Sequence, residues 1–186
     1  MMLRTEIFRK YKKNEDLDKK EIDLRMELLL EPEKKETLKE LAILEYNKKE
    51  YEAAKVIFKK LIELEPKNGE IYGFLGFINY ELEEYDESIE NFNKTISLMD
   101  DGTFVYFLLG NAYSRAGMIV EATKCYDIAI FKNLDIYNAH IDFVQKYEDM
   151  GCERRALKEY VAAYEIDPRD KKLKEKIESL REVIKK

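Results

Sequence analysis

The strongest constraint in this sequence is a period of 34 residues. Pro32 and Pro66 stand 34 positions apart, and Pro168 follows Pro66 after 102 positions, which is three further periods. Cutting the chain at this period gives five consecutive registers with no insertion or deletion, over residues 1–34, 35–68, 69–102, 103–136 and 137–170. A fixed period of this length indicates a repeat architecture, in which each repeat buries its apolar face against its neighbours.

Small and large side chains alternate at fixed phases of the last four registers. Phase 8 holds Ala42, Gly76, Gly110 and Val144, and phase 20 holds Ala54, Ser88, Ala122 and Ala156, which are small or nearly so. Phase 7 holds Leu41, Leu75, Leu109 and Phe143, and phase 24 holds Phe58, Phe92, Tyr126 and Tyr160, which are large. Phases 4, 7, 8 and 11 share one helical face, as do phases 20, 24, 27 and 28. Each register therefore predicts two amphipathic helices of about 12 to 14 residues with a turn near phase 15.

The glycines support this interpretation. Glycine inside a helix costs about 1 kcal/mol relative to alanine, so Gly76 and Gly110 at phase 8 predict close helix packing that offsets the cost. Gly117 and Gly151 share phase 15, where the first helix has to end and turn.

Three segments resemble tetratricopeptide repeats: YNKKEYEAAKVIFKKLIELEPKN, YGFLGFINYELEEYDESIENF and YFLLGNAYSRAGMIVEATKCYDIAI. That family pairs Leu-Gly near phases 7 and 8 with Ala at 20, Phe or Tyr at 24, Ala at 27 and Pro at 32. The resemblance covers residues 35–170. It departs from the pattern at Asp100 and Leu134, which replace proline, and at Leu61 and Thr95, which replace the alanine at phase 27. It implies an all-α fold, a right-handed α-solenoid of 34-residue helix-turn-helix repeats.

The two ends of the chain differ from the repeats between them. Residues 1–34 keep the period but put charged residues at phases that should be apolar or small, so we expect a degenerate repeat or an N-terminal cap. Its apolar residues still offer a face to bury: Ile7, Phe8, Tyr11, Leu17, Leu24, Leu28 and Leu30. Residues 171–186 carry one apolar stripe at helical spacing, which is typical of a C-terminal capping helix. We therefore expect one domain over residues 1–186.

Composition and charge exclude several functional classes. Subtracting the +3 of residues 1–20 and the +4 of residues 171–186 from the net charge of −6 leaves −13 for residues 21–170. Such an acidic body disfavours nucleic acid as a partner. No run approaches the roughly 20 apolar residues of a membrane helix, so we expect no membrane span and a cytoplasmic location. Cys125 and Cys152 are expected to be free thiols.

Catalytic chemistry is not indicated. The chain has one histidine, His140, and no cysteine cluster, Gly-rich phosphate loop or nucleophile elbow lies near it. We expect a packed histidine, no enzyme activity, no cofactor and no metal.

A binding surface is the remaining route to function. The resemblance implies that phases 2, 5, 6, 9, 12 and 13 of each first helix line a concave groove. The partner-binding residues predicted there are Phe74, Phe77, Tyr80, Phe104, Phe107, Leu108, Asn111 and Arg115. We expect a protein or peptide partner, with either an open aromatic strip or one buried by the protein's own structure. Two alternatives stay open: a self-associating scaffold, and a chaperone for hydrophobic segments of an exported or assembling partner.

Overall fold

The computed structural model describes residues 16–99 and 102–185, and every regular element in these ranges is an α-helix. This confirms the all-α repeat class. The chain divides into two compact units, one ending at Lys132 and the other beginning at Asn133. A single domain over residues 1–186 stays a prediction. Asp100 and the predicted apolar residues Ile7, Phe8 and Tyr11 lie outside the described residues.

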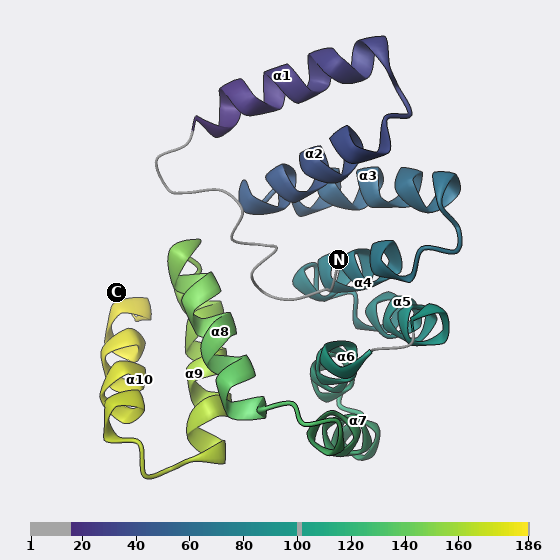
Figure 1. The fold of residues 1–186 in the computed structure, drawn as a ribbon. Helices are drawn as coiled ribbons and strands as arrows, with labels where there is room; N and C mark the ends of the chain where they lie inside the picture. Colours follow the sequence, from purple (N-terminus) through teal and green to yellow (C-terminus); the bar gives the residue numbers. More distant parts are fainter. Residues whose placement is uncertain (1–15, 100–101, 186) are drawn as a thin grey trace. The chain divides into compact units, whose positions relative to one another are not determined.

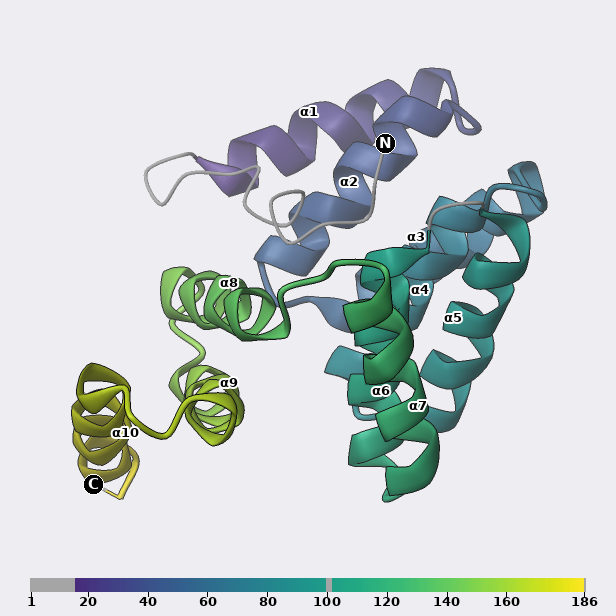
Figure 2. The same ribbon diagram turned by 60° about the horizontal axis from the view of Figure 1, so that its bottom comes forward.

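The first unit is a succession of helices in which each contacts the next along the chain (Figures 1 and 2). The helices are α1 (Leu17–Leu30), α2 (Lys35–Asn47), α3 (Tyr51–Leu64), α4 (Gly69–Glu81), α5 (Tyr85–Leu98), α6 (Thr103–Arg115) and α7 (Ile119–Phe131). From α2 onward they form pairs that match the predicted registers. The side chain of Asn68 caps the N-terminus of α4 by accepting a hydrogen bond from the backbone N–H of Glu70 at 3.1 Å.

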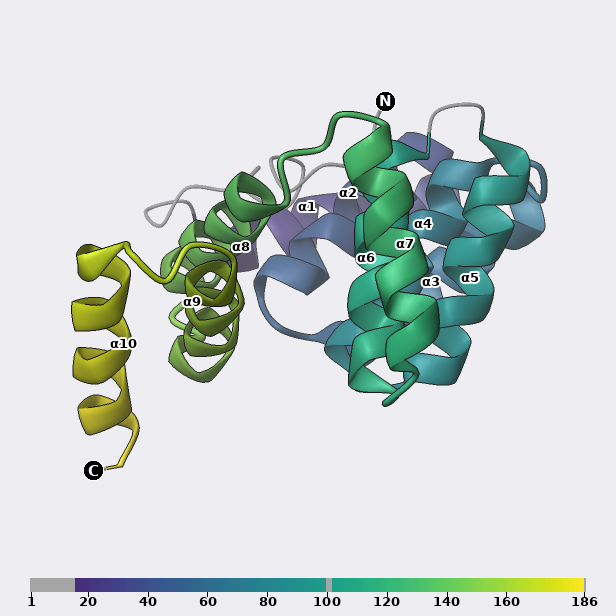
Figure 3. The ribbon, with the colours of Figure 1, turned by 90° about the horizontal axis from the view of Figure 1, so that it is seen from below.

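The second unit contains α8 (Ile136–Asp149), α9 (Glu153–Ile166) and α10 (Lys171–Ile184). Asp170 caps α10 by accepting from the backbone N–H groups of Lys172 and Leu173. In Figure 3, α10 lies beside α9. Leu173 and Ile177 are buried against a cluster that includes Tyr160. The predicted amphipathic helix is therefore present and covers α9.

The close approach predicted at phase 8 is confirmed. A Cβ atom on Gly76 would lie 2.9 Å from Cδ1 of Phe92, and one on Gly110 would lie 2.6 Å from Cε1 of Tyr126. Both ring residues occupy phase 24. The hydroxyl of Ser88, at phase 20, donates to the carbonyl oxygen of Gly76 at 2.8 Å. Small residues at phases 8 and 20 therefore bring the two helices of a repeat together.

The turn at phase 15 has the same backbone geometry in four registers. Gly117 has a φ of 79° and Gly151 a φ of 63°, as predicted for a helix end. Lys49 and Glu83 occupy this phase with φ values of 67° and 63°. The left-handed conformation is therefore required by the repeat, and two registers adopt it without glycine.

α1 packs on α2 through one side only. Leu24 is buried with Leu41 and Leu44, and Leu28 packs against them. Leu30, which we expected on the buried face, is 85% exposed, because α1 has its described contacts with α2 along the side that carries Leu24. The interpretation of residues 1–34 as a repeat or a cap stays open, since only this helix of the segment is described.

Candidate partner-binding face

Among the first helices of three registers, α2 contacts α4, and α4 contacts α6. The hydroxyl of Tyr46 donates to Oε1 of Glu81 at 3.0 Å. Nε of Arg115 donates to the hydroxyl oxygen of Tyr80 at 3.4 Å. Each contact joins phase 12 of one register to phase 13 of the next. A recurring polar contact therefore aligns the first helices side by side.

The aromatic row consists of the eight predicted binding residues on α4 and α6. Its members are Phe74, Phe77, Tyr80, Phe104, Phe107, Leu108, Asn111 and Arg115. Five of them are buried, with exposed fractions of 8% or less: Phe74, Phe77, Phe107, Leu108 and Asn111. These occupy phases 5, 6 and 9. The other three occupy phases 2, 12 and 13 and reach the surface.

Ring packing accounts for the burial of the two phenylalanines on α4. Phe74 stacks on Phe58 of α3, with ring centroids 5.3 Å apart and an angle of 10° between the planes. Phe77 packs on Tyr46 of α2 with centroids 5.9 Å apart. The side chain at phase 6 of α4 therefore packs on the preceding repeat. The pattern of a single helix does not show this contact.

Two of the buried members on α6, Phe107 and Asn111, contact the second helix of their own repeat. Phe107 lies 6.3 Å from Tyr126 between ring centroids. The hydroxyl of Tyr126 donates to Oδ1 of Asn111 at 2.8 Å. Asn111 is thus hydrogen-bonded inside the repeat.

Three members of the aromatic row are accessible. Tyr80 and Phe104 are half-buried and Arg115 is exposed. Phe104 lies against Phe107, with centroids 5.7 Å apart, and Tyr80 lies against Tyr85 at 5.9 Å. None of these contacts tests binding, so the role of the aromatic row toward a partner stays a prediction.

Carboxylates flank this face. Burial raises the pKa of Glu45 and of Glu70 above the ordinary value. Glu45 pairs with NH2 of Arg25 at 2.5 Å, and Glu81 accepts from Tyr46. Burial disfavours the charged form of a carboxyl group, and a nearby cation stabilises that charged form. The face therefore combines apolar rings with an acidic surround.

His140, in the second unit, is packed as predicted. It is 7% exposed, and its Nδ1 lies 2.8 Å from Oε2 of Glu159.

Within residues 16–99 and 102–185, no group of three or more His, Cys, Asp or Glu side chains is arranged to hold a metal ion. Cys125 and Cys152 are free thiols. In the same ranges, none of the helices has the length and apolarity needed to cross a bilayer.

Two exposed apolar surfaces were not predicted. On α1, the exposed residues are Ile22, Met26, Leu29 and Leu30, and on α7 they are Met118, Ile119, Val120, Ile128, Ile130 and Phe131, Met118 being the cap residue that precedes the helix. A comparison of phases could have found them. Phases 22, 26 and 29 of α5 hold Glu90, Lys94 and Ser97. Apolar residues at these outward phases of α1 and α7 are the sequence signal that would have predicted the two surfaces.

Comparisons with known proteins agree with this architecture. The family model described as "Tetratricopeptide repeat" matches residues 40–68 and 69–98. No curated protein matches the chain. A crystal structure of MamA is similar, with a TM-score of 0.64 and 24% identity over 84% of this chain and 92% of that chain. A tetratricopeptide repeat protein from Parabacteroides merdae ATCC 43184 has a TM-score of 0.64 and 17% identity, over 89% of this chain and 66% of that one.

A further solved structure is YrrB, described as "a TPR protein with an unusual peptide-binding site". Its TM-score is 0.57 and its identity 18%, over 87% of this chain and 84% of that chain. At these identities the likeness shows the fold.

Proposed function

We propose that this chain, a tetratricopeptide repeat protein, is a non-catalytic interaction module that binds a partner peptide or helix at the aromatic row. The single observation that carries the proposal is the alignment of α2, α4 and α6 by the Tyr46–Glu81 and Arg115–Tyr80 contacts. Tyr80 and Arg115, which form one of these contacts, are both accessible to a partner, and so is Phe104 on α6.

The buried members of the aromatic row pack α4 and α6 against neighbouring helices. Phe77 and Phe107 are at most 1% exposed and hold neighbouring helices together. The accessible members are the groups that a partner would touch first. Aromatic and arginine side chains supply most of the binding energy at protein interfaces. A short apolar peptide or an amphipathic helix suits such a surface.

A flanking carboxylate, that of Glu70, favours a partner with a basic residue beside its apolar face. Glu45 and Glu81 are buried and already held by Arg25 and Tyr46, whereas Glu70 is half-buried. Burial raises the pKa of Glu70, and a Lys or Arg of the partner brought close to it would lower that pKa and stabilise the complex. The peptide-binding site described for YrrB, which shares the fold, is in keeping with this proposal.

The test is selection of peptides from a random library against the immobilised full chain, followed by affinity measurements with variants. Tyr80→Ala, Phe104→Ala and Arg115→Ala remove accessible members of the row. Lys94→Ala on α5 is the matched control, because Lys94 is exposed on a second helix. Circular dichroism checks that each variant is folded.

We expect the selected peptides to be apolar with basic residues, and the three row variants to weaken binding by about tenfold or more. The control should bind as the wild type does. Peptides whose affinity is the same for all four variants would place binding elsewhere, and failure to select any peptide would argue against the module.

A further inference from the structure

α1 presents two different sides. Its inner side is fixed on α2 by Leu24 and by ion pairs, in which Lys48 contacts Asp18 and Glu21 at 2.6 Å each. Arg25 bridges Glu21 and Glu45 at 2.6 and 2.5 Å. These contacts fix the rotation of the helix about its axis. The opposite side is thereby held away from α2.

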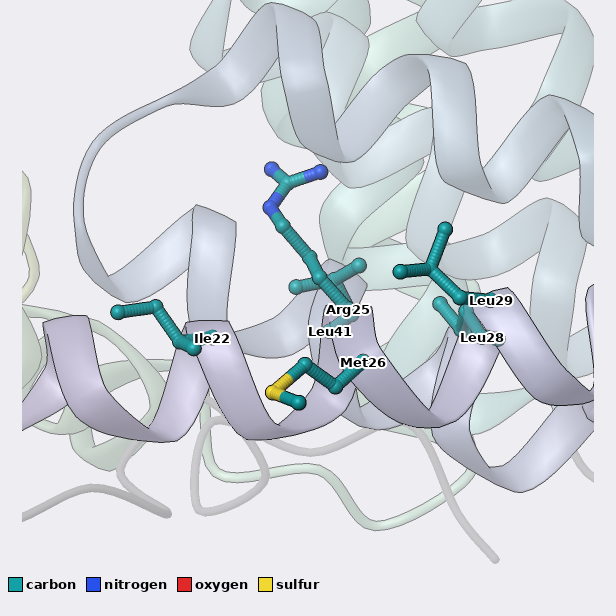
Figure 4. Close-up of a pocket in the computed structure, with 6 residues that line it drawn as sticks. All are labelled: Ile22, Arg25, Met26, Leu28, Leu29 and Leu41. Carbon is teal, nitrogen blue, oxygen red and sulfur yellow. The ribbon is translucent and has the colours of Figure 1, made fainter.

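The outer stripe of α1 is Ile22, Met26, Leu29 and Leu30, with exposed fractions of 57%, 60%, 80% and 85%. The spacing of four, seven and eight residues puts them on one helical face. A cleft of about 420 Å³ opens beside the stripe and is lined by Ile22, Arg25, Met26, Leu28, Leu29 and Leu41 (Figure 4). Contiguous exposed apolar patches larger than a few hundred Å² usually mark interaction sites on soluble proteins.

We propose that the outer stripe pairs with the outer stripe of a second copy of this chain, with the two α1 helices antiparallel. Three residues of the stripe, Ile22, Met26 and Leu29, line the cleft. The same exposed side chains would enter the cleft of the other copy. Such self-complementarity is what a two-fold interface requires. A two-fold axis at Met26 places residue 22 opposite residue 30, because both are four residues from 26.

Charge at the ends of α1 selects the antiparallel direction. Lys19 lies in the first turn and Glu33 in the turn after the helix. Within the described part of the chain, the side chains of these two residues form no hydrogen bond or ion pair, whereas Lys34 pairs with Glu27 and Lys20 with Glu40. The axis at Met26 brings the first turn of α1, which carries Lys19, beside the turn that follows α1 in the second copy, which carries Glu33. Parallel helices would instead bring like charges together.

The size of the stripe predicts a weak dimer. Stable protein interfaces bury about 800 Å² per partner, and four apolar side chains form only the centre of such an area. Sedimentation equilibrium of the full chain from about 1 µM to 1 mM covers the corresponding range of affinities.

Two sets of variants test the interface. Met26→Lys puts a charge on the axis and should weaken association by at least about tenfold. Val56→Lys on α3 is the matched control, because Val56 is 66% exposed at another outward phase, and it should associate as the wild type does. Lys19→Glu and Glu33→Lys should each weaken association, while the double variant should restore it by reversing both pairs. Circular dichroism checks that α1 stays folded.

A wild-type chain that is monomeric throughout the range would refute the proposal and assign the outer stripe to another occupant. Equal effects of Met26→Lys and Val56→Lys would place any dimer contact away from α1. A double charge variant as weak as the single ones would refute the antiparallel register. Peptide binding at the aromatic row is read in a separate assay, so either proposal can fail without the other.

Discussion

Replacing Gly110 with alanine tests the packing that defines the repeat. A Cβ atom at this position would lie 2.6 Å from Cε1 and 2.8 Å from Cδ1 of Tyr126. Carbon atoms in contact prefer about 3.5 to 4.0 Å, so the ring has to move by about 1 Å. That movement is opposed, because the Tyr126 hydroxyl donates to Oδ1 of Asn111 at 2.8 Å.

The expected change in the free energy of unfolding follows from three contributions. Overpacking a core costs about 1 to 3 kcal/mol, and disturbing the hydrogen bond to Asn111 costs about 1 kcal/mol. Alanine gains about 1 kcal/mol over glycine in a helix. We therefore expect Gly110→Ala to destabilise the protein by about 1 to 3 kcal/mol, a noticeable share of a typical total stability of about 5 to 15 kcal/mol.

The assay is urea unfolding of the full chain followed by circular dichroism, with midpoints compared at constant slope. In a Tyr126→Ala background the obstructing ring is absent, so Gly110→Ala should become stabilising by about 1 kcal/mol. Gly117→Ala is the control for backbone effects: its φ is 79° and no atom lies within 4 Å of the added Cβ. Its cost should not depend on Tyr126. A Gly110→Ala protein that is more stable than the wild type would refute the close approach.

Three further predictions concern the turns and α1. Glu83→Gly should raise stability by about 1 kcal/mol in a thermal melt, because Glu83 holds a φ of 63° that costs an L-residue, and an unchanged melting temperature would contradict this. Burial raises the pKa of Glu45 in the folded protein. The stability contributed by the protonated Glu45 side chain is therefore fully present below its unfolded pKa of about 4.3 and is lost as the pH rises through its folded pKa. The free energy of unfolding of the wild type should therefore fall relative to that of Glu45→Gln over this rise in pH, as measured by urea unfolding at each pH. Parallel pH profiles of the two proteins would refute this prediction. Leu24→Ala should cost about 2 to 5 kcal/mol and release α1, seen as faster hydrogen exchange of its amides; unchanged protection would show that the ion pairs alone hold the helix.

The phases of the repeat could be read from the sequence because they express local geometry. Gly76 at phase 8 and Phe92 at phase 24 are in contact within one helix pair, and that contact depends only on helical spacing and a short turn. The glycines at phase 15 have the positive φ that a helix end demands. Leu61 and Thr95 depart from the alanine of phase 27, yet both are fully buried. The fold therefore tolerates a change of side chain where the phase is kept.

The burial of the aromatic row could not be read in the same way. Phe74 is covered by Phe58, which lies on the preceding repeat. Whether a residue at phase 6 faces a neighbour or a groove depends on how successive repeats stack, and no spacing within one helix determines this. The exposure of Leu30 has a related cause, since burial along α1 depends on which side of the helix packs on α2. Local periodicity identifies apolar faces but does not say which neighbour covers them.

The two proposed surfaces lie on different helices of the first unit, and this separation has a functional consequence. The aromatic row is on α4 and α6, whereas the outer stripe is on the side of α1 that faces away from α2. Pairing through α1 would therefore leave both rows available, so a dimer would offer two binding sites. Linked sites bind a partner with two copies of a motif more tightly than either site alone. A weak α1 contact would then act by raising the avidity for a partner with two motifs, while the affinity for a single peptide stays the same.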